Sequence, residues 1–262
     1  MRNEAEPERK AILMALPVIA ITNESTVLTD DEVKAVLPAL QRQCDIDFCG
    51  FWDMTCQLEF IDRNGVIVSD PSLSPGLPAG WWQIVIVDDP DQAGALGYHE
   101  MSSQGTPLGK VFARLDIQSG SSWTVTLSHE LLEMLGDPWI NWCAQGSDGK
   151  VYALEVCDAV EADELGYEID GVLVSDFITP SWFEPTEADR VDFKRRISTP
   201  FELAPGGYIS VLDPAKGWTQ ITARGVGGPP IPGGSRRQRR SVAKWAWQRS
   251  AGVRRKPTLL AH

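Results

Sequence analysis

The chain has 262 residues, 43% hydrophobic and 23% charged, with a formal net charge of −12, which is the composition of an ordinary globular protein. It has no run of about 18 apolar residues, and acids and bases stand directly before its first apolar stretch, unlike in a signal peptide; we therefore expect a cytoplasmic protein without a membrane span. Its five cysteines include no CxxC pair, so a zinc–cysteine site is not expected.

Strand and helix signals alternate in the first half of the chain. Short apolar segments that favour strands lie at residues 16–22, 58–61, 82–87, 95–99 and 108–115. Between the first two, a helix begins at an N-cap, Thr29 or Asp30, and runs to about Cys44. Pro38 lies inside this helix and predicts a kink.

The second half of the chain carries shorter signals. Strand and hairpin patterns lie at residues 151–157, 167–174, 208–212 and 218–222, and the last two are expected to pair as a hairpin. The hairpin at 167–174 turns at Asp170-Gly171, a pair that favours the tight turns of hairpins. Thr186, followed by acids, predicts a closing helix that runs to about Ile197.

The segment SSWTVTLSHELLEMLGD, residues 121–137, is predicted to be a helix that presents metal ligands. His129 and Glu133 are four residues apart, so on a helix they lie on one face and can reach one ion. Glu130 sits one step round the helix, where a general base for metal-assisted hydrolysis is needed. We expect the helix to end at Gly136, in the left-handed conformation of a C-cap.

The spacing alone leaves a plainer interpretation open, because HExxE on a helix surface can be a solvated polar pair. The apolar pattern argues against that interpretation. Leu127 and Leu131 belong to the core side of the helix, whereas His129, Glu133 and Asp137 fall together on another side. Ionisable groups aligned on one helix face favour a divalent-metal site.

The segments around this helix resemble the metzincin clan of zinc metallopeptidases, most closely its matrixin-like members. Those enzymes carry an edge strand, a strand ending near Phe and Asp, and then a Trp, which match GALGYHE at 94–100, GKVFARLD at 109–116 and Trp123. Their HExxHxxGxxH or HExxHxxGxxD motif is matched at His129, Glu130 and Gly136. The resemblance covers roughly residues 16–198, and the chain is also similar to uncharacterised bacterial and phage zincin-like proteins with HExxE and a later EVCD segment.

Three positions depart from the metzincin pattern. Glu133 stands where the second histidine is expected, Trp139 where the third ligand is expected, and Ile178 where a downstream turn has methionine. Another acid then has to complete the ligand set. Asp137 is the nearest in sequence, and Glu155 is the better choice if a separate element supplies the ligand.

Two further acids downstream are weaker candidates for the third ligand. If residues 151–157 form a strand, Glu155 and Cys157 share one face, whereas Asp158 points away from it. Asp158 and Glu161 are therefore less favoured than Glu155. A set of one histidine and two carboxylates is harder and more anionic than three histidines, so the ion is expected to be zinc or another divalent metal.

The resemblance implies an α/β (α+β) zincin-like fold: a mainly parallel twisted sheet with an antiparallel edge strand, an active-site helix and a closing C-terminal helix. It also implies peptide-bond hydrolysis, with Glu130 taking a proton from a metal-activated water. An extended peptide or protein substrate would pair with the strand near residues 94–100. His99, on that strand, would contact the substrate or stabilise an oxyanion; a half-exposed strand histidine is the plainer alternative.

The charge distribution divides the chain into two parts, a domain at residues 1–224 and a basic Gly/Pro-rich tail at 225–262 that has a possible short helix at 241–250. Residues 214–262 hold 11 of the 24 Lys and Arg residues and no acid, which leaves the rest of the chain with a formal charge of −23. The tail is expected to contact an anionic partner such as nucleic acid, or the chain's own acidic body. An alternative function is therefore a catalytically silent scaffold that binds a protein or nucleic-acid partner through its cleft or this tail.

Overall fold

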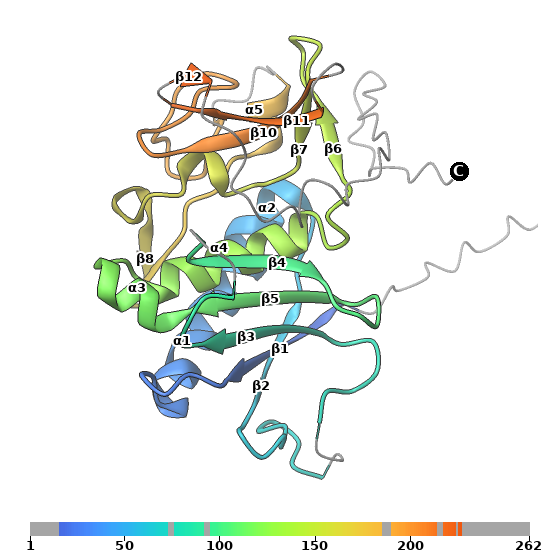
Figure 1. Cartoon of the computed structure of the whole chain (residues 1–262), viewed down its shortest axis with the longest axis vertical. Coiled ribbons are helices and arrows are strands. Elements are labelled where there is room, and N and C mark those ends of the chain that lie inside the picture. Colours follow the sequence, from blue (N-terminus) through green and yellow to red (C-terminus); the bar gives the residue numbers. More distant parts are fainter. Residues whose placement is uncertain are drawn as a thin grey trace, which may run out of the picture.

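The computed structural model describes residues 16–72, 76–91, 95–184, 190–213, 217–223 and 225–226. It shows a mixed α/β fold in which one five-stranded sheet carries helices on one face, while a second five-stranded sheet stands beyond its last strand (Figure 1). No helix in the described ranges is long and apolar enough to cross a membrane. The predicted helix at 241–250 and the basic tail beyond Val226 lie outside the described residues.

The first sheet is mixed, as expected. Its strands, in spatial order, are β2 (Gln57–Ile61), β1 (Val18–Asn23), β3 (Trp82–Val87), β5 (Pro107–Phe112) and β4 (Gly97–Met101). The first four run parallel, and β4 is antiparallel to β5 at the edge of the sheet. The interior strand β1 is buried on both faces, which explains its apolar run from Val18 to Ile21, with Ile19, Ala20 and Ile21 all at 0% exposure.

The first helix begins where the sequence predicts, but the helical segment continues further than expected. In α1 (Asp30–Arg42), the Thr29 hydroxyl accepts from the Glu32 amide while the Glu32 carboxylate accepts from the Thr29 amide, which forms a complete capping box. The chain then passes without a break into a π-helix, η1 (Gln43–Phe48), and α2 (Cys49–Trp52). Asp53, in the left-handed conformation with φ 56°, ends this run.

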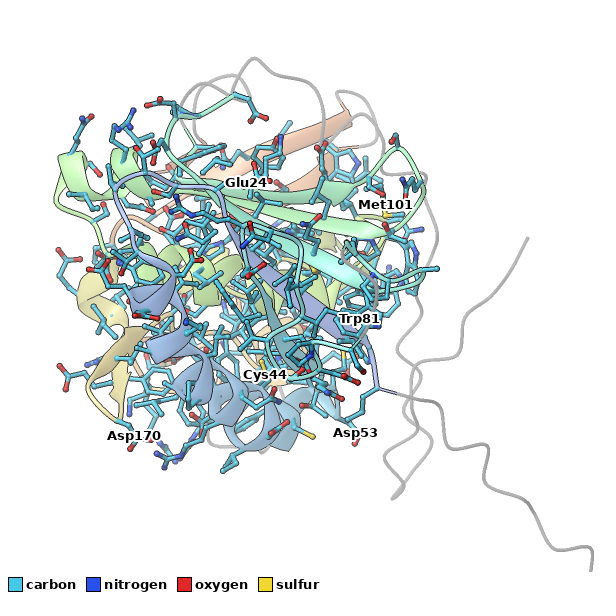
Figure 2. All side chains as sticks on the ribbon, turned by 90° about the horizontal axis from the view of Figure 1, so that it is seen from below. Glu24, Cys44, Asp53, Trp81, Met101 and Asp170 are labelled. Carbon is cyan, nitrogen blue, oxygen red and sulfur yellow. The ribbon has the colours of Figure 1, made fainter. Side chains whose placement is uncertain are left out.

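Helices α1 and α4 (Trp123–Gly136) cover the same face of the first sheet (Figure 2). One core cluster joins them to the strands, with Val33 and Leu40 from α1, Leu127 and Leu131 from α4, and Ile84 from β3. A short helix that the sequence did not predict, α3 (Ala113–Ser119), follows β5 directly, where a longer strand was expected.

The second half of the chain forms the second sheet and a separate hairpin. The second sheet has the order β12 (Gly225–Val226), β11 (Gly217–Thr222), β10 (Tyr208–Asp213), β7 (Val151–Ala153) and β6 (Cys143–Gln145). The predicted pairing of β10 with β11 is confirmed. So is the hairpin of β8 (Tyr167–Ile169) and β9 (Val172–Val174), in which Asp170 and Gly171 take φ values of 51° and 83°.

The predicted closing helix is wrong over residues 190–197, and its expected start at 185–189 lies outside the described residues. Instead the chain runs as turns beside the short helix α5 (Pro180–Phe183) and forms a bridge between Ile178 and Asp192. The Asp192 carboxylate accepts from the backbone amides of Arg196 and Ile197, at 2.7 and 3.2 Å, so side-chain hydrogen bonds replace those of a helix.

Candidate metal centre

The helix α4 is buried almost all round, which differs from an ordinary surface helix. Leu127 and Leu131 lie in the main core at 0% exposure, as predicted. The polar side is buried too, because His129 is 9% and Glu133 0% exposed. Burial of ionisable groups on a helix costs free energy unless other groups or ions compensate for it. The residues around His129 and Glu133 therefore indicate what compensates for their burial.

A first group of possible ligands contains His129, Glu133 and Asp158. The His129 Nε2 atom lies 3.2 Å from Oε1 of Glu133 and 3.5 Å from Oδ1 of Asp158. One ligand atom from each residue lies within 4.8 Å of the other two, so a single ion can reach all three. His129 and Glu133 are thus brought together as predicted, and Asp158 joins them.

Asp158 reaches this position because the strand β7 ends at Ala153, earlier than the sequence predicted. The chain then leaves strand geometry and enters a 3-10 turn, η2 (Asp158–Val160), so the alternation that pointed Asp158 away does not apply. Gly136 allows the approach. It is the last helical residue, without the predicted left-handed conformation, and a Cβ on it would lie 3.1 Å from a Val156 methyl.

A second group contains His99, Glu130 and Glu133. His99 comes from β4, opposite Gly109 of β5, and its ring is at 0% exposure instead of half-exposed. Its Nδ1 atom lies 3.5 Å from Oε2 of Glu130 and 3.7 Å from Oε2 of Glu133. The ligand atoms of these three residues also lie within 4.8 Å of one another.

The two acids that the sequence favoured as third ligand lie outside both groups. Asp137 is buried at the end of α4, where its Oδ1 accepts from the backbone amides of Asn141 and Trp142, each at 3.0 Å. It thereby orders the turn that leaves the helix. Glu155 is buried on the segment between β7 and η2.

The electrostatics of the centre are those of a buried anionic cluster. Burial lowers the pKa of His129, but the carboxylates of Glu133 and Asp158 outweigh it and raise that pKa well above its ordinary value. Burial, and then the Asp158 charge, raise the pKa of Glu161 to about 8. Carboxylates held this close are stabilised by a cation among them.

The donor set fits a divalent ion. Each group offers one imidazole nitrogen and carboxylate oxygens, ligands that suit zinc, manganese or iron. The described residues give no hydrogen-bond partner to either ring nitrogen of His99, although the ring is fully buried. A buried imidazole nitrogen that faces two carboxylates and makes no hydrogen bond has the surroundings of a metal ligand.

Gly97 fixes how closely β4 approaches α4, so Gly97→Ala is expected to displace Glu130 and destabilise the fold. An added Cβ would lie 2.7 Å from a Thr126 methyl, 2.9 Å from the Lys110 carbonyl oxygen and 3.0 Å from Cγ of Glu130. Overpacking of this kind costs about 1–3 kcal/mol. Thermal unfolding measures it against the control Gly50→Ala, where a Cβ meets nothing within 4 Å. Equal melting temperatures for the two variants would contradict this packing.

Comparison of the chain with protein-family models, with curated proteins and with solved structures finds no match.

Proposed function

We propose that this protein is a metal-dependent peptidase whose ion is held by His129, Glu133 and Asp158. The observation that carries the proposal is the buried first ligand group, formed by two residues of α4 and Asp158 of η2, with the Glu130 carboxylate beside Glu133. The ion would be zinc or another divalent metal. When bound, it would polarise the scissile carbonyl and make a water molecule more acidic.

Glu130 is the general base in this proposal. Its carboxylate projects from the same helix as His129 and Glu133, one residue from the first ligand, and accepts the proton from the attacking water. His99 is the positioning residue for this base. Its Nδ1 atom faces the Glu130 carboxylate at 3.5 Å and would hold that carboxylate in place beside the first ligand group.

The substrate class follows from the edge strand. In the described sheet β4 pairs only with β5, which leaves its outer edge available for an extended peptide. β4 also carries His99, so a peptide paired along its outer edge would run beside the ligand groups. This arrangement, together with the resemblance of the surrounding segments to metzincins, supports peptides over other hydrolysable substrates.

Glu130→Gln tests the proposal most directly. The amide keeps the size of the side chain but cannot accept the proton, so we expect a loss of turnover of about 100-fold or more with the ion retained. Peptide hydrolysis and elemental analysis are measured on the same sample, with the exposed Glu168→Gln of β8 as the control. Full activity in Glu130→Gln would reject the peptidase, and loss of the ion held by His129, Glu133 and Asp158 would reject the role of base.

Burial of the centre favours a second candidate, a scaffold in which the ion is structural. Glu133 and His99 are at 0% exposure, and His129 at 9%, which is typical of closed structural metal sites. A structural ion needs no base. In that case Glu130→Gln changes no catalytic rate and shifts the melting temperature only slightly. Removal of the ion with a chelator, in contrast, lowers the melting temperature strongly.

A further inference from the structure

We infer that the centre binds a second divalent ion, held by His99, Glu130 and Glu133, with the Glu133 carboxylate bridging the two ions. The first group and this second group meet in a single side chain. Oε1 of Glu133 faces His129 at 3.2 Å, whereas Oε2 faces His99 at 3.7 Å. One oxygen is thus directed to each group, which is the arrangement of a bridging carboxylate in two-metal sites.

The His99 ring is the independent evidence for this second site. It is at 0% exposure, and both ring nitrogens lack a hydrogen-bond partner among the described residues. A buried imidazole with neither nitrogen satisfied costs free energy that a metal–nitrogen bond removes. Its Nδ1 atom faces Glu130 and Glu133, the two carboxylates that would complete the set.

The charges of the ligands also favour two ions. Glu130, Glu133 and Asp158 bring three negative charges to neighbouring positions, and one divalent ion neutralises two of them. A second divalent ion gives the third carboxylate a counter-ion and reduces the repulsion between the Glu130 and Glu133 carboxylates, whose oxygens lie within 4.8 Å of each other.

The second ion changes what Glu130 can do. As a ligand, Glu130 holds its lone pairs toward the ion and no longer accepts a proton from water. Under the proposed function, the protein with one ion is therefore active and the protein with two ions is inhibited. Only this inhibition rests on the proposed function. The second site can bind an ion whether or not the protein is a peptidase.

Metal titration of the full chain with Mn²⁺ tests the inference through stoichiometry and electron paramagnetic resonance. We expect the wild type to take up two ions in sequence, with the second equivalent producing an exchange-coupled spectrum, because ions in two-metal sites lie about 3.5–4 Å apart. His99→Gln, which keeps volume but removes the imidazole, should bind one ion with an uncoupled spectrum. Its affinity for the second ion should fall by at least roughly 100-fold, since loss of an outer-shell partner alone lowers metal affinity by about 10–100-fold.

The variant Asp158→Asn supplies the converse result, since it should weaken the first site and leave one uncoupled ion at the second. Saturation of the wild type at one ion, or coupled spectra in His99→Gln, would overturn the two-ion centre. If the protein binds a single ion, and this ion is kept in His99→Gln and lost in Asp158→Asn, the second site is rejected. The ion of the proposed peptidase is then retained. The wild-type spectrum decides the question even if a variant fails to fold.

Discussion

Glu133→Ala is expected to leave the protein without any bound divalent ion. Glu133 is the one residue common to both ligand groups, so its removal takes a carboxylate oxygen from each. Elemental analysis after dialysis against zinc or manganese measures the loss. The exposed Glu168→Ala, on β8, removes a similar side chain that belongs to neither ligand group and should retain the full metal content.

The melting temperature of Glu133→Ala, measured with and without added ion, separates metal binding from folding. Added ion is expected to stabilise the wild type by about 4 kcal/mol at a free concentration 1,000 times its dissociation constant, or roughly 8–16 °C in melting temperature for a chain of this size. Glu133→Ala should show no such shift. An equal metal-dependent shift in both proteins would mean that the ion binds elsewhere, and the centre on α4 would be rejected.

A second large effect is expected from Asp176→Asn, which should stabilise the protein increasingly as the pH rises. Asp176 is fully buried, and burial, together with a hydrogen bond to Asp192, raises its pKa to about 9. Asp176 is therefore protonated at neutral pH and donates to Asp192. Its Oδ1 atom accepts from the backbone amides of Phe177 and Lys194, at 2.8 and 3.2 Å. An asparagine keeps both functions, because its oxygen accepts and its amide group donates.

The sign of the pH dependence follows from proton linkage. The pKa of Asp176 is raised from 3.8 in the unfolded chain to about 9 in the folded protein. Between these two values the folded state holds the extra proton, so wild-type stability falls as the pH rises from about 4 to about 9, by at most about 1.4 kcal/mol per pH unit. Below about pH 4 both states are protonated and this contribution is fully present.

Urea unfolding at a series of pH values measures this effect. The free energy of unfolding of Asp176→Asn, minus that of the wild type, should grow with pH by several kcal/mol and level off near pH 9. Asp70→Asn, at an exposed position, should give a flat difference over the same range. A flat difference for Asp176→Asn as well would show that Asp176 is not protonated in the folded protein.

Much of the fold was determined by local sequence signals. The Thr29 capping box, the apolar strand segments and the Asp170-Gly171 turn each act over a few residues, so the sequence predicts them and the structure confirms them. The pairing of His129 with Glu133 belongs to the same class. A spacing of four residues on a helix is sufficient to bring the two side chains together.

Only the tertiary structure decided which residues complete the centre. His99 and Asp158 come from an edge strand and from a turn on opposite sides of α4 in the sequence, and no local pattern ties them to that helix. Asp158 was disfavoured because strand alternation was extended past Ala153, where the strand in fact ends. Such an end depends on which neighbour pairs with the strand, and that information is not local.

Close packing between distant segments decided the remaining details. Gly136 is favoured by the approach of Val156, not by a turn of its own backbone, and Gly97 by the approach of Thr126, the Lys110 carbonyl and Glu130. Residues 190–197 carry a helix pattern, but hydrogen bonds from their backbone amides to the buried carboxyl groups of Asp176 and Asp192 outweigh it. The sequence by itself therefore determined the ligand helix and most of the strands. The third candidate ligand, the place of His99 and the sharing of Glu133 between the two groups depend on contacts between segments far apart in the chain.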